Sequence, residues 1–192
     1  MLGVEQLGRF INEQATRSAF RLEARDFYAI DSEEAGRYLQ GEAEPTWAQG
    51  GDWAKRLTEA RTKGVRRYRV HVLESPLNDY LRYECEWGYV YTTSVGEQIY
   101  ILDTADVPRP EGLDDEDFWL LDDRYLLRMH YDDEGNFLGA EELPESALDH
   151  YRRQRDLALE RAVAFQDYWN AHPEYWRENG LGKSTNVDQK ES

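Results

Sequence analysis

The stretch VRRYRVHVLESPLNDYLRYECEWGYVYTTSVGEQIYILD, residues 65–103, decides the fold. Over its first ten residues apolar side chains alternate with charged ones, which predicts a strand in a sheet with one buried and one polar face. The polar face would carry Arg67, Arg69 and His71. Ser75 and Pro76 then have the pattern of an N-cap followed by proline at the first helical position. We therefore expect a helix over residues 76–93, and EQIYILD as the next strand.

Downstream of this stretch, short apolar strands and tight turns predict an antiparallel meander over residues 97–143. DFWLLD and YLLRMHY are separated by an acidic turn, and DDEGN is typical of a hairpin turn that is followed by the return strand FLGAEEL. The period then changes, because apolar residues from Leu148 to Trp169 follow one helical stripe and predict a long helix over residues 144–171. Short helices are predicted over residues 4–14, 32–41 and 52–63.

These elements together predict an α+β fold in which the sheet is packed by the short N-terminal helices, the central helix and the long C-terminal helix. The chain of 192 residues is long enough to bury a substantial core, and we expect a single domain over residues 1–181. The polar residues 182–192 are expected to form a disordered tail.

The charge of the chain is strongly negative and unevenly distributed. The net charge is −16, and residues 74–150 alone hold twenty-one acids and four bases. Such a chain repels nucleic acid and attracts a basic protein. The acidic surface also serves solubility, and the basic residues 53–73 could hold an anion or pair internally. We expect a basic protein partner and no direct binding of nucleic acid.

The cysteine content and the motifs of the sequence indicate the compartment and the cofactors to expect. A single cysteine, Cys85, fits a reducing cytoplasm, and we expect neither a secretory signal nor a membrane span, because no apolar run reaches the required length. Phosphate-binding glycine loops and a nucleophile elbow are not found. The two acidic runs are DDEDFWLLDD (residues 114–123) and DDEGN (residues 132–136), and neither has the ligand spacing of a calcium-binding loop. We therefore expect no cofactor and no metal.

The predicted helix over residues 76–93 raises the question of a site. Tyr80, Glu84, Trp87 and Tyr91 would share one face, which is more typical of a core than of an active site. Glu84 is the exception, because a carboxylate on such a face needs a partner, which Arg67 or Arg69 could supply. We favour a structural ion pair. The functional alternative is a pocket in which Glu84, Glu97 or Tyr80 is catalytic and the ligand is bound by Arg67, Arg69, Tyr80, Trp119 and Asp122.

Several motifs in order resemble an uncharacterised family of actinobacterial proteins, a domain of unknown function. The resemblance covers roughly residues 20–170 and rests on the following residues: Arg67 and Arg69, Ser75-Pro76, Asp79-Tyr80-Leu81, Gly96-Glu97, Phe118-Trp119-Leu120 and Arg155-Asp156. Members of this family commonly lie beside helix-turn-helix transcriptional regulators, so the resemblance implies a role in gene regulation by association. It implies no reaction.

Two functions therefore stay open. The first is an acidic interaction module that partners a basic DNA-binding regulator, which the charge and the resemblance favour. The second is an enzyme or ligand sensor with a mixed-charge aromatic pocket between the strand at 65–74 and the helix at 76–93.

Overall fold

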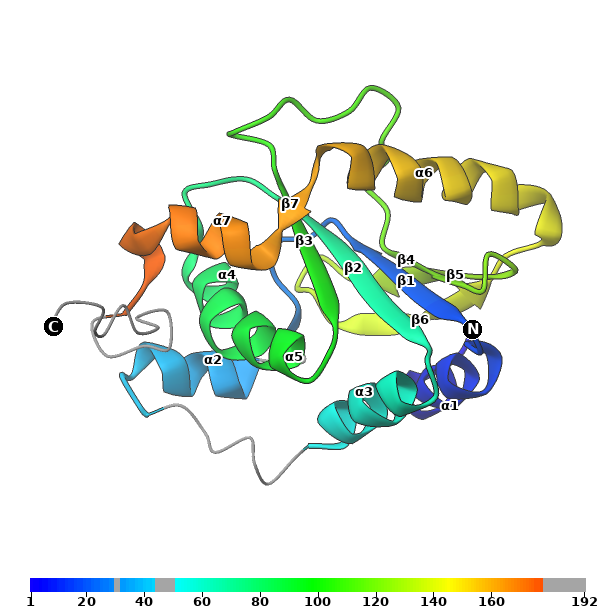
Figure 1. The fold of residues 1–192 in the computed structure, drawn as a ribbon, viewed down its shortest axis with the longest axis horizontal. Coiled ribbons are helices and arrows are strands. Elements are labelled where there is room, and N and C mark those ends of the chain that lie inside the picture. The colour runs from blue at the N-terminus through cyan, green and yellow to red at the C-terminus, as the bar shows by residue number, and fades with distance from the viewer. Residues whose placement is uncertain (30–31, 44–50, 178–192) are drawn as a thin grey trace, which may run out of the picture.

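The computed structural model describes residues 1–29, 32–43 and 51–177, which form a seven-stranded mixed sheet with helices on both faces (Figure 1). The predicted tail at 182–192 lies outside these residues. The strands are β1 Ser18–Glu23, β2 Arg66–Leu73, β3 Gln98–Asp103, β4 Phe118–Leu121, β5 Tyr125–Tyr131, β6 Phe137–Glu142 and β7 Val163–Ala164. The helices are α1 Val4–Gln14, α2 Ser32–Leu39, α3 Asp52–Thr62, α4 Asp79–Tyr83, α5 Val90–Ser94, α6 Leu148–Arg161 and α7 Phe165–Ala171.

The α+β class is confirmed, but the predicted antiparallel meander is too long. The strand order is β6-β5-β4-β1-β2-β3-β7, so the meander contains only β4, β5 and β6. β3 lies on the other side of β1 and β2, and both the β1–β2 and the β2–β3 pairs are parallel. The parallel pairing is explained by the segments that connect these strands. Helices join β1 to β2 and β2 to β3, and such a crossover returns the chain in the same direction.

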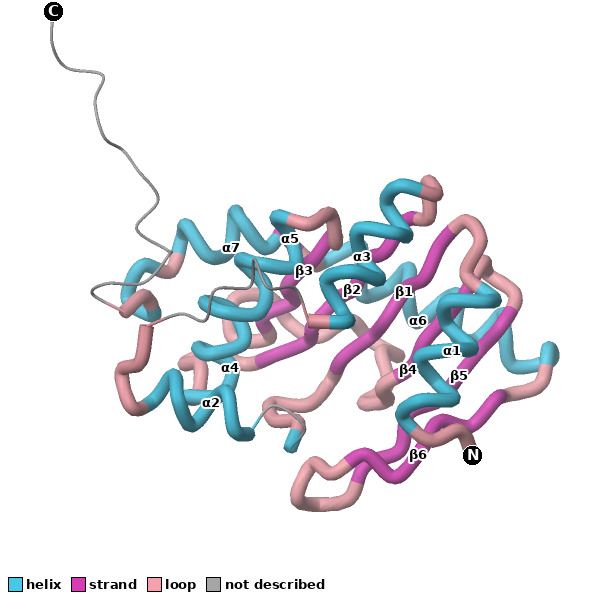
Figure 2. Tube along the Cα trace, turned by 90° about the horizontal axis from the view of Figure 1, so that it is seen from below, coloured by secondary structure: helices cyan, strands magenta, loops and turns pink. Residues whose placement is uncertain are grey.

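The helices divide between the two faces of the sheet. α6 covers the face that carries Val70 and Val72, while α1, α2, α3, α4 and α7 pack on the opposite face. Figure 2 shows part of this layering, with α6 behind the strands and α1 in front of β4 and β5. This opposite face of the sheet carries Arg69 and His71. Because helices cover it, these two polar side chains are buried.

The predicted long helix at 144–171 is wrong in its continuity. A 3₁₀ turn at Glu145–Ala147 precedes α6, which ends at Arg161, and Ala162 has extended backbone angles (φ −78°, ψ 147°). The next two residues form β7, which pairs with β3, and α7 follows. Tyr151 and Ala158 of α6 pack on one face of the sheet, and Phe165 and Trp169 of α7 pack on the other. One helix could not contact both faces, so the chain crosses the sheet edge between them.

The predicted central helix at 76–93 exists but begins later and is not uniform. Asn78 is its N-cap, because its Oδ1 accepts a hydrogen bond from the backbone N–H of Leu81 at 2.8 Å. α4 then continues as a π-helix, Glu84–Tyr89, and ends as α5. π-Helical turns are rare in proteins, and those that do occur are often found at functional sites.

The short N-terminal helices are confirmed as α1, α2 and α3, and the hairpin turn at residues 132–136 is confirmed between β5 and β6. Gly135 in that turn has φ +80°, a value that glycine adopts without strain. In the described part of the chain, no helix has the length and apolarity needed to cross a membrane.

Candidate functional site

The polar face of β2 is buried, contrary to the expectation of a solvated face. Arg67, Arg69 and His71 are only 5%, 6% and 0% exposed. The helices that pack on this face cover these side chains. Because a buried charge needs a partner, the neighbouring strands and helices must supply carboxylates and hydroxyls.

The parallel pairing of β1 with β2 supplies the first partners. Arg21 is in register with Arg69, and Glu23 is in register with His71. Residues in register point to the same face of the sheet. The strand pairing therefore places two arginines, one glutamate and one histidine side by side in the interior.

Glu23 and Glu97 hold the two arginines through short ion pairs. Glu23 Oε1 lies 2.9 Å from Arg21 Nη2, and Glu23 Oε2 lies 2.8 Å from Arg69 Nη1. Arg69 Nε and Nη2 both donate to Glu97 Oε1, at 2.9 and 2.6 Å. Burial by itself would raise the pKa of Glu23, but the guanidinium groups of Arg21 and Arg69 outweigh burial and hold that pKa below its usual value.

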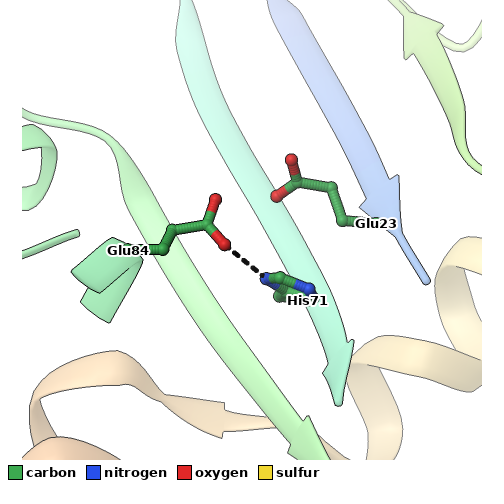
Figure 3. Close-up of side chains that lie close together, drawn as sticks. All are labelled: Glu23, His71 and Glu84. Atoms are coloured by element: carbon green, nitrogen blue, oxygen red, sulfur yellow. Dashed lines mark ion pairs between the residues drawn. The ribbon is translucent and has the colours of Figure 1, made fainter. Parts of the chain in front are cut away.

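Glu84 and Tyr89, from the two ends of the π-helix, complete the group beside His71. His71 Nδ1 lies 2.7 Å from Tyr89 Oη and 3.5 Å from Glu84 Oε2. Tyr89 Oη also lies 3.1 Å from Glu23 Oε2, so its single proton is shared between two acceptors, this carboxylate and an unprotonated His71 Nδ1. Figure 3 shows Glu23, His71 and Glu84 converging from β1, β2 and the helix. We refer to Arg21, Glu23, Arg69, His71, Glu84, Tyr89 and Glu97 as the buried polar network.

A fourth carboxylate, Asp117, extends the network on the side of β4. Asp117 Oδ2 accepts a hydrogen bond from Tyr28 Oη at 2.6 Å and lies 4.0 Å from Arg21 Nη2. Burial raises the pKa of Asp117 above its usual value and that of Tyr28 well above its own. At neutral pH the tyrosine is therefore the hydrogen-bond donor.

A cavity of about 420 Å³ lies against this network on the same face of the sheet. Its charged lining includes Arg21, Glu23, Arg69 and Glu84, and its aromatic lining includes Tyr28, Tyr83, Tyr89, Trp119 and Tyr131. The Arg21 guanidinium carbon lies 5.5 Å from the ring centre of Tyr28 and 5.6 Å from that of Trp119. α1 and α3 close the opposite side with the apolar residues Leu7, Ile11 and Ala54.

Among the predicted candidates, Arg69, Glu84 and Trp119 line this cavity and Glu97 lies behind it on Arg69. The others lie elsewhere. Tyr80 packs among Phe27, Tyr28 and Tyr83. Arg67 donates to Asn12 at 3.2 Å and burial lowers its pKa.

Asp122, another candidate, lies in the turn between β4 and β5. Its carboxylate accepts hydrogen bonds from the backbone N–H groups of Thr16, Arg17 and Ser18. Glu84 Oε2 lies 3.5 Å from His71 Nδ1, and Arg69 pairs with Glu23 and Glu97.

Sequence reasoning missed Arg21, Glu23, His71 and Tyr89 as members of one group. The available signal was the alternation in FRLE, residues 20–23, combined with the strand–helix–strand order of residues 65–103. That order predicts parallel pairing of the two strands within residues 65–103. The pairing of residues 20–23 with the first of these strands is set by the tertiary structure.

Comparison with known proteins gives the chain a family without an assigned activity. It matches no curated protein at a significant level. A family model described as a domain of unknown function (DUF6879) matches residues 5–170, a range that includes every residue of the buried polar network. The chain therefore belongs to this uncharacterised domain family.

Proposed function

We propose that the chain is a small-molecule-binding protein whose ligand occupies the cavity above the buried polar network. The observation that carries the proposal is the row of buried charges, Arg21, Glu23 and Arg69, in the lining of a 420 Å³ cavity. A buried ion-pair network is commonly no more stabilising than an apolar replacement of similar volume. The position of this network in the lining of a cavity is better explained by a role in ligand binding than by a role in stabilising the fold.

The lining favours a ligand that combines a planar ring with a polar group. The volume is that of typical small-molecule sites, which are mostly apolar with a few fixed polar groups. The lining is rich in aromatic side chains, which include Tyr28, Tyr83, Tyr89, Trp119 and Tyr131. Arg21, held by Glu23 at 2.9 Å, offers a pre-positioned donor group. Pre-positioning lowers the entropy that binding must otherwise cost.

The alternative, a basic protein partner, stays a prediction with weaker support. It is favoured by the negative charge of residues 74–150, by the missing catalytic signatures and by the resemblance. However, most carboxylates of the acidic residues 111–123 contact groups of the same chain. Asp114 pairs with His150, Asp115 with Arg109 and Glu116 with Arg128. Charges that are already paired attract a partner less strongly. A partner recovered at low salt and lost at high salt would support it.

Two helix glycines provide a matched test of the cavity. Gly88 lines it, and a Cβ added there meets only Glu84 Cγ at 3.7 Å. Gly36 in α2 has nothing within 4 Å of an added Cβ and does not line the cavity. Gly88→Met fills the cavity without changing a charge, whereas Gly36→Met makes the same change outside it. Both replace glycine within a helix, so neither should destabilise through backbone propensity.

Each protein is incubated with a metabolite extract of its source cells and desalted. Mass spectrometry then identifies the compounds it retains. We expect the native chain and Gly36→Met to retain the same compound and Gly88→Met to lose it. Retention of that compound by Gly88→Met, or no retained compound in any of the three, would contradict the proposal.

A further inference from the structure

Three potential metal ligands lie close together beside the cavity, and two of them, Glu23 and Glu84, line it. One oxygen each from Glu23 and Glu84 and one ring nitrogen of His71 lie within 4.8 Å of one another (Figure 3). All three residues are buried, at 1%, 9% and 0% exposure. They come from β1, β2 and the π-helix, so no local sequence spacing marks them.

The orientation of His71 is that of a metal-binding imidazole. Its Nε2 lies 2.9 Å from the carbonyl oxygen of Arg25. A carbonyl only accepts, so Nε2 carries the proton, and a neutral ring then has its lone pair on Nδ1. Metal-binding histidines almost always donate their second N–H to a carbonyl or carboxylate in this way. The lone pair faces the two carboxylates.

The spacing of His71 Nδ1 and Glu84 Oε2 fits two ligands of one ion better than a hydrogen bond. His71 Nδ1 and Glu84 Oε2 are 3.5 Å apart, which is long for a hydrogen bond between nitrogen and oxygen. Two ligand atoms that each lie about 2.1 Å from a tetrahedral ion are about 3.4 Å apart. Tyr89 Oη lies 2.7 Å from Nδ1 and 3.1 Å from Glu23 Oε2, so its proton can be donated to Glu23 when an ion takes the lone pair of Nδ1.

The charge of the surroundings also favours a cation. Contacts connect the two arginines Arg21 and Arg69 with four buried carboxylates: Glu23, Glu84, Glu97 and Asp117. With a neutral His71, the four carboxylates of this group outnumber its two arginines by two. A divalent ion balances this difference. The alternative compensation is a second proton on His71, which supplies one charge and requires no metal.

We propose that Glu23, His71 and Glu84 bind a divalent transition-metal ion of the zinc or manganese type. The imidazole nitrogen favours such ions over magnesium and calcium, which prefer oxygen ligands. Glu23 and Glu84 both line the cavity, so the ion's remaining coordination positions face it and would bind a polar group of a ligand. This inference goes beyond the proposed function, because the metal binds whether or not an organic ligand is present.

The test is a metal titration of the full chain after chelator treatment and dialysis. ZnCl₂ and MnCl₂ are titrated by calorimetry, with MgCl₂ as the comparison, and bound metal is counted by elemental mass spectrometry. We expect one equivalent of zinc or manganese per chain. Glu84→Gln, which keeps the shape of the side chain, should weaken the affinity at least tenfold.

Two further variants separate the site from general effects on folding. Glu86→Gln removes a buried carboxylate of the same π-helix that contacts Tyr38 and Arg177, and it should leave metal affinity unchanged. Tyr89→Phe removes the hydroxyl that competes for His71 Nδ1 and should bind the metal at least as tightly. The proposal is overturned if the native chain binds no stoichiometric metal, or if Glu84→Gln binds it as tightly as the native chain. No organic ligand is present, so this outcome is independent of the retention experiment.

Discussion

The turn between β4 and β5 allows a sharp test of how one carboxylate stabilises the sheet. Asp122 Oδ2 accepts hydrogen bonds from the N–H of Thr16 at 3.1 Å and from its Oγ1 at 2.5 Å, and Oδ1 accepts from the N–H groups of Arg17 and Ser18, both at 2.8 Å. These contacts attach the segment before β1 to the central hairpin. The perturbation is Asp122→Asn, which keeps one oxygen and replaces the other by an amide nitrogen that cannot accept.

The expected cost follows from the two hydrogen bonds that the amide cannot make. Each hydrogen bond to a charged group contributes about 1.5–3 kcal/mol, and partial access of water to the turn reduces their sum to about 2–4 kcal/mol. Backbone strain does not contribute to this difference. Asp122 has φ +54°, and asparagine tolerates that conformation as well as aspartate does.

The neighbouring aspartate provides the control. Asp123 has nearly the same backbone angle, φ +56°, but its half-exposed side chain forms an ion pair with Arg155. An exposed pair contributes about 0–1 kcal/mol, so Asp123→Asn should cost no more than that. Urea unfolding followed by circular dichroism measures the free energy of unfolding of all three proteins. Equal stabilities of Asp122→Asn and Asp123→Asn would refute the reasoning.

The dependence on pH gives a second readout from the same proteins. Burial by itself would raise the pKa of Asp122, but the hydrogen bonds from Thr16, Ser18 and Arg17 outweigh it and hold the pKa below its usual value. A carboxyl whose pKa is lowered by folding stabilises the protein above its unfolded pKa of about 3.9, and this contribution is lost as the pH falls through the folded value. The stability difference between the native chain and Asp122→Asn should therefore be constant from pH 7 to about 5 and shrink below about pH 4. A difference that does not change down to pH 3 would contradict this assignment.

Two further predictions concern single residues whose environment is unusual. An alanine at Gly135 (φ +80°) would place its Cβ 2.9 Å from Phe27 Cδ1, whereas a Cβ at Gly112 (φ +83°) would meet open space. Gly135→Ala should therefore lower the free energy of unfolding by about 2–3 kcal/mol and Gly112→Ala by about 1 kcal/mol. Thermal or urea unfolding measures both. Similar losses at both positions would show that the contact with Phe27 relaxes freely. Cys85 is 1% exposed, so a thiol reagent should modify it only after denaturant is added, and rapid modification of the folded chain would show that the π-helix opens in solution.

Local signals in the sequence determined most of the secondary structure. The helical stripes of residues 4–14, 32–41 and 52–63, the strands around 66–73 and 98–103, and the hairpin at 132–136 all follow from periodicity and turn residues. These patterns depend on neighbours a few residues apart, so they can be read without knowledge of the fold. The α+β class followed from the order of the elements, and the buried place of Glu84 followed from its aromatic helix face.

Tertiary structure decided which strands are neighbours and what the polar face does. Strand pairing depends on contacts between segments far apart in sequence, and here it set β1 between β2 and β4 and aligned Glu23 with His71. The apolar stripe of residues 144–171 looked continuous because helical periodicity does not record which face of the sheet each turn contacts. Likewise, alternation in β2 could not say whether Arg69 meets water or a carboxylate. Only the packing of helices over that face turned a polar side of a strand into a buried network with a cavity above it.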